Sequence, residues 1–205
     1  MITIVDYNAG NLRSVKRACD AVGIESEFTQ SPEKVASSGR IIFPGVGAAA
    51  SAMTTLRETG LDRAIREAFD KGVPILGICL GAQIILEHSE EGDTECLGLI
   101  KGSTLRFKLD DPNLKIPHMG WNEVIPRQSH PLLDGLEAGG EFYFVHSYYP
   151  QPAQDSDVFA MAEYEKPFCC ALGHKNLFAT QFHPEKSGNF GLNMLKRFAL
   201  WDGRV

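Results

Sequence analysis

The chain has 205 residues, of which 43% are hydrophobic and 22% charged, and its formal net charge is -6 at pH 7. These values fit one globular domain over residues 1–205, and a negative charge without a basic stripe argues against nucleic-acid binding. No apolar run approaches the roughly 20 residues of a membrane span and no basic leader segment begins the chain, so we expect a cytoplasmic protein.

The first half of the chain alternates between strand-like and helix-like patterns. The expected strands are residues 2–6, 24–29, 40–43 and 73–78, and the expected helices are residues 12–22, a segment that starts at Ser31-Pro32-Glu33, residues 48–56, residues 61–71 and residues 80–87. Strands that alternate with helices predict a parallel sheet covered by helices on both faces.

The second half changes character after about Gly98. The expected strands there are residues 105–108, 121–124, 141–149 and 158–164, then a hairpin of residues 168–172 and 177–182, and a closing helix over residues 189–201. We therefore expect an α/β fold: an open, mostly parallel sheet flanked by helices, with a more antiparallel C-terminal portion.

Cys79 stands in the sequence Gly-Ile-Cys-Leu-Gly at residues 77–81, between an apolar strand and a helix. Glycines on both sides of a nucleophile are typical of a sharp strand-to-helix turn that exposes the side chain. Free backbone N–H groups at the start of the helix favour the thiolate. A small buried cysteine at a tight junction would give the same five-residue pattern.

The other four cysteines, at positions 19, 96, 169 and 170, form no Cys-x-x-Cys pair with each other or with Cys79. Neither a disulfide framework nor a four-cysteine zinc site is indicated, and we expect reduced thiols, no metal and no cofactor.

A thiol nucleophile needs a base, and the base needs a carboxylate that orients it. His183-Pro184-Glu185 offers both, because proline pushes His183 toward an extended backbone in which residues two apart share one side. Glu185 could then bind one ring nitrogen while the other faces the thiol. A His-Pro turn after an edge strand, with a solvated glutamate, is the competing interpretation. His146 is the main rival as base, although a strand histidine that bonds to a backbone group would look the same.

Acyl transfer also requires donors for a developing oxyanion. The N–H of Leu80 can supply one, and the glycine-rich turn at residues 44–47 can supply a second from Val46 or Gly47. Residues 45–50 also match a dinucleotide-binding spacing, which we reject because the acidic residue expected after a second strand would be Asp62, in a helical segment.

With these pieces together, the chain resembles the triad glutamine amidotransferases, and more closely the glutaminase subunits of imidazole glycerol phosphate synthases. The resemblance rests on residues 6–12, 44–48, 77–83, 117–122, 144–149 and 181–187. Ala50, Ala82 and the Asn8-Ala9 turn depart from the family pattern, which affects loop shape more than chemistry.

The resemblance implies a reaction and a set of roles. Cys79 would attack the side-chain amide of glutamine, His183 would carry the proton to the leaving ammonia, and Glu185 would orient His183. Water would then hydrolyse the thioester. The substrate contacts carried over from the family are Gly47, Gln83, Glu91, Tyr143, Ser147 and Tyr148.

The resemblance also implies a partner. In the family, ammonia passes to a (βα)8-barrel cyclase subunit, which makes imidazole glycerol phosphate and aminoimidazole carboxamide ribotide in histidine biosynthesis. The expected contact residues in this heterodimer are Tyr7, Asn8, Asn11, Met119, Trp121 and Lys186. A core position for Trp121 is the alternative.

Three other functions stay open at this point. The chain could be the glutaminase of another pathway, of the pyridoxal phosphate or anthranilate synthase type. It could be a cysteine-dependent α/β ester hydrolase that ignores glutamine, or a non-enzymatic, redox-sensing protein in which His183 and Glu185 are dispensable.

Overall fold

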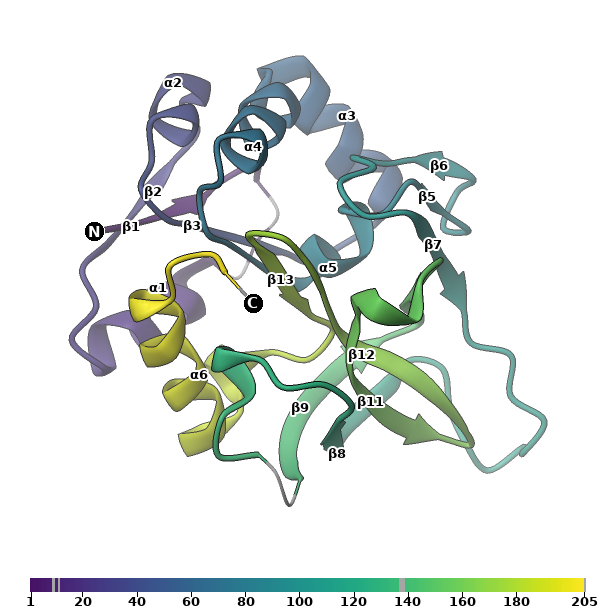
Figure 1. Cartoon of the computed structure of the whole chain (residues 1–205). Helices are drawn as coiled ribbons and strands as arrows, with labels where there is room; N and C mark the ends of the chain where they lie inside the picture. Colours follow the sequence, from purple (N-terminus) through teal and green to yellow (C-terminus); the bar gives the residue numbers. More distant parts are fainter. Residues whose placement is uncertain (9, 11, 137–138, 205) are drawn as a thin grey trace.

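The computed structural model describes residues 1–8, 10, 12–136 and 139–204. Within these residues, nine strands form one sheet in the order β2-β1-β3-β4-β13-β12-β11-β8-β9 (Figure 1). The strands of this sheet are β1 (Ile2–Val5), β2 (Ser26–Thr29), β3 (Ile41–Gly45), β4 (Ile75–Cys79), β8 (His118–Pro126), β9 (Gly140–His146), β11 (Val158–Tyr164), β12 (Lys166–His174) and β13 (Leu177–Thr180).

The sheet changes from parallel to antiparallel at β13. Strands β2, β1, β3, β4 and β13 are parallel neighbours, whereas β12, β11, β8 and β9 continue the sheet in antiparallel pairs. The expected α/β class with an antiparallel C-terminal portion is confirmed. The junction matters for the site because β13 lies directly beside β4.

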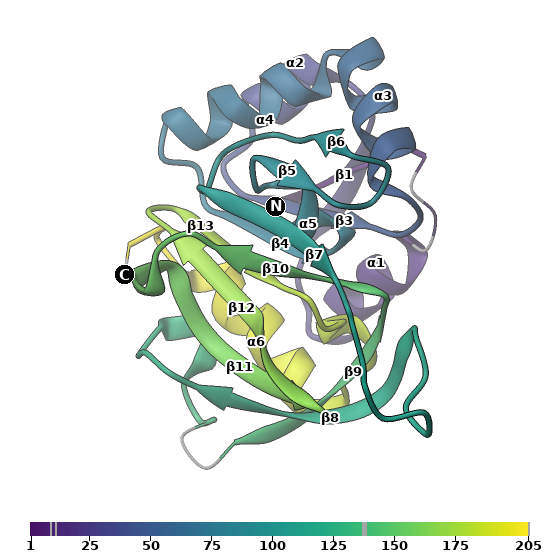
Figure 2. The same cartoon turned by 90° about the vertical axis from the view of Figure 1, so that its right-hand side faces the viewer.

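A smaller sheet of four short strands was not expected from the sequence. Its order is β10 (Tyr148–Pro152), β7 (Gly102–Arg106), β5 (His88–Ser89) and β6 (Thr94–Glu95). Strands β10, β7 and β5 pack against the short helix that follows β4 (Figure 2). The expected strand over residues 141–149 is in fact two strands, β9 and β10, which belong to different sheets.

Helices cover both faces of the large sheet. They are α1 (Leu12–Ala21), α2 (Pro32–Ala36), α3 (Ala49–Thr59), α4 (Leu61–Asp70), α5 (Leu80–Ile84) and α6 (Gly188–Leu200), with short 3-10 helices η1 (Pro131–Leu133), η2 (Asp155–Asp157) and η3 (Pro184–Lys186). One hydrophobic core joins α1 and α6 to one face of the sheet. A second core joins α2, α3, α4 and α5 to the other face. The two helix groups are on opposite sides in Figure 1.

The amphipathic spacing explains these layers. Val15, Ala18 and Cys19 recur at helical spacing on α1 and are all buried. By contrast β4, in the middle of the sheet, is buried at every position because helices cover both of its faces. In the described part of the chain, no helix has the length and apolar character to cross a bilayer.

Candidate active site

The candidate nucleophile lies on a strained turn. Cys79 ends β4 and has φ 54° and ψ -107°, a conformation that few residues with a side chain adopt. The flanking glycines are sterically required: a Cβ on Gly81 would lie 2.0 Å from the carbonyl oxygen of Phe43, and one on Gly77 would lie 2.9 Å from Cβ of Ala179. The close approach of helix and strand therefore fixes Cys79 at the carboxyl edge of the sheet.

The candidate base comes from the neighbouring strand. β13 is parallel to β4, with Thr180 opposite Ile78, so the residues that follow β13 lie beside the turn at Cys79. His183 is extended, with φ -101° and ψ 94°. The extended segment does not continue to Glu185 as expected, because η3 begins at the proline. This 3-10 turn still brings Glu185 Oε1 to 2.8 Å from His183 Nδ1.

The groups around His183 favour the addition of a proton to its ring. Because Nδ1 donates to Glu185, Nε2 carries the free lone pair, and it has no hydrogen-bond partner of ordinary geometry among the described residues. Burial alone would lower the pKa of His183, but the charge of Cys79 and the hydrogen bond to Glu185 act in the opposite direction, and the pKa is raised. The imidazole is therefore suited to take a proton from the thiol.

A cavity of about 300 Å³ opens at Cys79. Its walls come from both halves of the sheet and from the loops between them. The lining residues are Val46, Gly47, Cys79, Leu80, Gln83, Glu91, Pro117, Val145, His146, Ser147 and Tyr148. The structure thus gathers all three expected oxyanion donors and, of the expected substrate contacts, Gly47, Gln83, Glu91, Ser147 and Tyr148.

The oxyanion candidates flank the sulfur on two sides. Gly45 is paired with Cys79 across β3 and β4, so the turn that contains Val46 and Gly47 lies next to the nucleophile. Gly47 has φ +100°, which favours glycine at this position. Leu80 begins α5, where a backbone N–H has no acceptor within the helix. Val46, Gly47 and Leu80 all line the cavity beside Cys79.

Glu91 is held at the cavity wall and is not a solvated loop residue. Its Oε2 accepts a hydrogen bond of 2.8 Å from the backbone N–H of Ala49, the first residue of α3. Its own N–H donates to Ser89 Oγ at 3.1 Å. A carboxylate at a helix N-terminus is stabilised by the helix dipole. One oxygen is committed to α3, and the other can accept from a ligand.

The expectation that Tyr7 lies on a contact surface is wrong. Tyr7 is 3% exposed and packs on Phe43, with ring centroids 5.5 Å apart. Its hydroxyl lies where a Cβ on residue 45 would be, which explains the glycine there. Asn8 is exposed, and its N–H donates to Asp6 Oδ1 at 3.0 Å. Asn11 lies outside the described residues.

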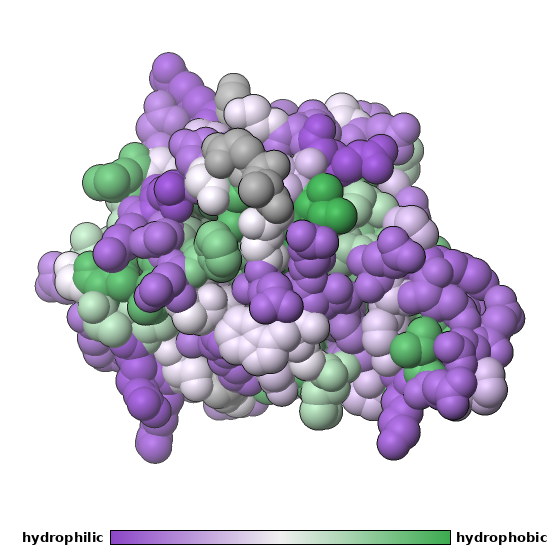
Figure 3. Space-filling view, turned by 90° about the horizontal axis from the view of Figure 1, so that it is seen from below, coloured by the Kyte–Doolittle hydropathy of each residue, from purple (hydrophilic) through white to green (hydrophobic). Residues whose placement is uncertain are grey.

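Tyr143 lies apart from the cavity, with the candidate contact residues. Its ring meets that of Trp121 edge to face, with centroids 6.2 Å apart, and Lys186 Nζ lies 5.7 Å from its centroid. Met119 and Trp121 are 63% and 55% exposed. Trp121 is therefore not a core residue. Seen from below the view of Figure 1, where β8 and β9 lie, the molecule is mostly hydrophilic with several separate hydrophobic groups (Figure 3).

His146 cannot act as a base here, because both ring nitrogens are occupied. Nδ1 lies 2.7 Å from the carbonyl oxygen of Tyr148, which can only accept, so Nδ1 carries the proton. Nε2 then accepts from Nδ1 of His118 at 3.0 Å. Burial lowers the pKa of His146 to about 3 and that of His118 to about 4. The sequence offered no sign of this pair, since its members meet only through the pairing of β8 with β9.

A residue that sequence reasoning overlooked contacts the sulfur itself. Gln181 is completely buried, and its Nε2 donates to Cys79 Sγ at 3.7 Å. The available signal was position: Gln181 follows β13 directly and precedes His183 by two residues.

Comparisons with known proteins agree with this geometry. Residues 3–201 match the family model "Glutamine amidotransferase class-I". A protein of Dehalococcoides mccartyi is 47% identical over 97% of this chain and 96% of its own length. One of Chromobacterium violaceum is 46% identical over 100% of this chain and 99% of its own. This chain belongs to the class I glutamine amidotransferase family. Both relatives are named imidazole glycerol phosphate synthase subunit HisH.

Solved structures of class I glutamine amidotransferases and related assemblies share the fold. One described as a glutamine amidotransferase superposes with a TM-score of 0.75 at 18% identity, covering 97% of this chain and 99% of the other. The PurLQS structure from Thermotoga maritima also gives a TM-score of 0.75, at 21% identity and 96% coverage of each chain.

Proposed function

We propose that this class I glutamine amidotransferase is the glutaminase subunit of an imidazole glycerol phosphate synthase, acting in the cytoplasm in histidine biosynthesis. It hydrolyses L-glutamine to glutamate and ammonia. Two full-length relatives that carry that name, at 47% and 46% identity, support the pathway. The observation that carries the chemistry is the buried His183–Glu185 pair, 2.8 Å apart, beside the strained Cys79 at the cavity wall.

The residues divide the reaction between them as follows. Cys79 gives its proton to His183 Nε2, and the sulfur attacks the side-chain carbonyl carbon of glutamine. The carbonyl oxygen becomes negative and accepts from the N–H groups of Leu80 and of Val46 or Gly47. When the tetrahedral intermediate collapses, the carbon–nitrogen bond breaks and His183 protonates the departing ammonia. Water, deprotonated by His183, then cleaves the thioester and restores the thiol.

Glu185 favours proton transfer from the Cys79 thiol to His183. It fixes the tautomer of His183 through Nδ1 and stabilises the imidazolium that forms after the thiol is deprotonated. Glu185 is not itself in the cavity wall. Its contribution is therefore to orientation and charge.

Glutamine recognition follows from which atoms remain free in the cavity. Both N–H groups of Gln83 are used, one on the Tyr148 carbonyl and one on Gln181 Oε1, each at 2.9 Å. Only Oε1 of Gln83 is left to accept from an N–H of the ligand. The free oxygen of Glu91 suits the α-ammonium group. Ser147 and Tyr148 complete the wall around the side-chain amide.

Ammonia released in water becomes ammonium, which is not a nucleophile, so a partner must capture it. We propose a heterodimer with a (βα)8-barrel cyclase, which contacts the exposed residues Met119, Trp121 and Lys186 together with Asn8. Tyr143, whose ring contacts both Trp121 and Lys186, belongs with these residues more than with the substrate cavity.

The test is ammonia release from glutamine, measured with and without the cognate cyclase. We expect Cys79→Ala and His183→Ala to lose activity by at least about 10³-fold, and Glu185→Gln to lose it partly, because the imidazole remains in place. Cys19→Ala removes a buried thiol on α1, which contributes no residue to the cavity wall, and serves as the matched control. No ammonia from the native chain with its cyclase, or full activity of Cys79→Ala, would refute the proposal. Turnover of a small ester with no turnover of glutamine would indicate a hydrolase instead.

A further inference from the structure

The side chain of Gln181 occupies a position next to the sulfur that the reaction scheme above leaves unused. It is 0% exposed, and its Nε2 lies 3.7 Å from Cys79 Sγ, a normal separation for a hydrogen bond to the large sulfur atom. Among the described residues, Cys79 Sγ is the one acceptor that Gln181 Nε2 contacts. Burial of an amide N–H costs free energy unless an acceptor receives it.

The orientation of this amide is fixed by its contacts with Gln83 and, through Gln83, with the Tyr148 carbonyl. The Tyr148 carbonyl can only accept, so the group of Gln83 that faces it at 2.9 Å must be the NH₂. That same NH₂ lies 2.9 Å from Gln181, so Gln181 must present its oxygen to it. The nitrogen of Gln181 then faces the sulfur. A flipped Gln181 amide would place two donors, its own NH₂ and that of Gln83, against each other on one side and an oxygen against the sulfur on the other.

The Tyr148 carbonyl is itself held by a second donor. His146 Nδ1 donates to it at 2.7 Å, and His118 and Asn122 continue the same chain of donors at 3.0 and 3.3 Å. Because every donor and acceptor in this chain has one consistent direction, the amide has one stable orientation. A neutral thiol is a weak acceptor, whereas a thiolate is a strong one, so the site favours the charged sulfur.

We infer that Gln181 is a thiolate-stabilising residue of the active site, which donates its side-chain N–H to Cys79 Sγ under the control of Gln83. This inference rests on the proposed role of Cys79 as nucleophile. It assigns Gln83 a second task besides ligand binding, namely to orient Gln181.

The measurement is the rate at which iodoacetamide alkylates Cys79, followed as a function of pH by mass spectrometry of the Cys79 peptide. The thiolate is the reacting form, so the midpoint of the profile reports its stability, and the high-pH plateau reports access to the sulfur. The midpoint of the profile belongs to several interacting groups and not to Cys79 alone, because other side chains that titrate or carry charge face this region. They are His183, Tyr7, Glu91 and His146. These groups are the same in the native chain, in Gln181→Met and in the control, so a difference between their midpoints can be compared directly.

In Gln181→Met, which keeps the length of the side chain but has no donor, we expect the midpoint to move up by about half to one pH unit. The rate near pH 7 then falls roughly three- to tenfold while the plateau is unchanged. Gln181→Glu, which places a carboxylate oxygen against the sulfur, should move the midpoint further in the same direction. It also serves as the second variant if Gln181→Met does not fold, as judged by circular dichroism. Gln151→Met makes the same chemical change at an exposed position of β10 and should leave the midpoint in place.

An unchanged midpoint in the folded variants would overturn the inference, as would a lower plateau with no shift, which would indicate a packing role alone. The assay needs neither glutamine nor the cyclase. Failure of the glutaminase assay would therefore refute the proposed function without touching this result, and an active enzyme with unshifted alkylation would refute only the role of Gln181.

Discussion

Four buried histidines show how the surroundings of one side-chain type decide its charge. The pKa of His183 rises because Cys79 and Glu185 face it, whereas burial lowers the pKa values of His118, His130 and His146, which bond to no carboxylate within the described residues. The His-Pro-Glu sequence was sufficient to predict which histidine has the acid. It could not predict the 3-10 turn that joins them, because proline restricts the residue before it and does not determine the turn that follows.

The buried neutral histidines should make the fold sensitive to mild acid. His130 is 1% exposed, stacks on Phe178 at 4.2 Å, and accepts the N–H of Leu132 at Nδ1, while burial lowers its pKa to about 4. The unfolded chain binds a proton at this residue below about pH 6.5, and the folded chain does so only near pH 4. The stability that neutral His130 contributes is thus complete above pH 6.5 and is lost as the pH falls toward 4.

We therefore expect His130→Asn to flatten the dependence of unfolding free energy on pH, by up to about 1.4 kcal/mol per pH unit between pH 6 and 4.5. Urea unfolding at several pH values measures this slope. Phe178→Leu weakens the same packing but keeps the titrating group, so it should lower stability with the slope retained. Equal slopes in His130→Asn and the native chain would contradict the prediction.

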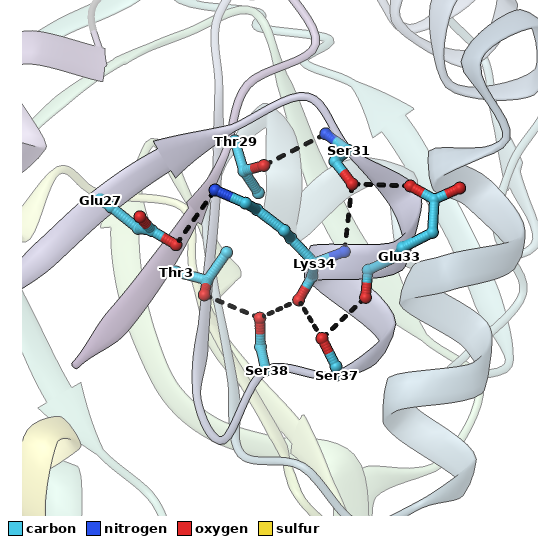
Figure 4. Close-up of polar contacts among 8 residues, drawn as sticks. All are labelled: Thr3, Glu27, Thr29, Ser31, Glu33, Lys34, Ser37 and Ser38. Carbon is cyan, nitrogen blue, oxygen red and sulfur yellow. Dashed lines mark hydrogen bonds and ion pairs between the residues drawn. The ribbon is translucent and has the colours of Figure 1, made fainter.

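At the scale of elements, the short helix α2 shows how side-chain caps compensate for length. Five residues are too few for a helix that is stable by itself in water. Ser31 Oγ accepts the N–H of Lys34 at 3.2 Å and donates to Glu33 Oε2 at 2.7 Å, while Ser37 and Ser38 hold the carbonyls at the other end (Figure 4). The sequence predicted this start correctly. In Ser-Pro-Glu, serine is a typical helix cap, proline is typical of the first helical position, and an acidic residue is favoured in the first turn.

Ser31→Ala should lower the free energy of unfolding by about 1 kcal/mol, because it removes the acceptor for an orphan N–H. Chemical denaturation measures the loss, and the glutaminase rate should not change, since α2 contributes no residue to the cavity. The matched control is Ser51→Ala on the exposed face of α3, where the serine caps no helix end. A loss as large in the control as in Ser31→Ala would show that the cap has no special role.

The elements that the sequence did not predict are those with weak local patterns. β5 and β6 have two residues each, too few for an alternation to be visible, and β10 was merged with β9 because both are rich in aromatic residues. The strand that ends at Cys79 and the helix before it, by contrast, have clear apolar patterns with Gly72 between them, although the helix expected over residues 80–87 ends at Ile84. The strand and turn that carry Cys79 were therefore better predicted than the short strands of the smaller sheet.

At the scale of the whole molecule, the cavity is shared between the two halves of the sheet. The parallel half supplies Cys79 and the turn at Val46 and Gly47, and the antiparallel half supplies Val145 and His146. One sheet runs through the described chain, which supports our proposal that residues 1–205 form a single domain. The set of contact residues was only partly predictable, because an exposed aromatic such as Trp121 differs little in its local sequence from a buried one such as Tyr7.

Trp121→Ala should weaken the complex with the cyclase by at least about tenfold, since a half-exposed tryptophan beside Tyr143 is well suited to be an interface anchor. Isothermal titration calorimetry gives the dissociation constant, and thermal unfolding should show that the variant remains folded. Leu200→Ala, at an exposed position of α6 that is 85% accessible, is the control. Equal affinity for the Trp121→Ala variant and the native chain would remove this residue from the proposed interface.

The position of β13 has a consequence for synthesis on the ribosome. This strand is formed by residues 177–180 yet occupies the place between β4 and β12 in the middle of the sheet. A nascent chain therefore contains the thiol long before it contains the strand that delivers the imidazole. Until residues 177–183 have left the exit tunnel, the edge of β4 that faces β13 is unpaired, and Cys79 lacks the histidine that we propose as its base. On this proposal, a chain that has not yet been extended past His183 has no means to cleave glutamine.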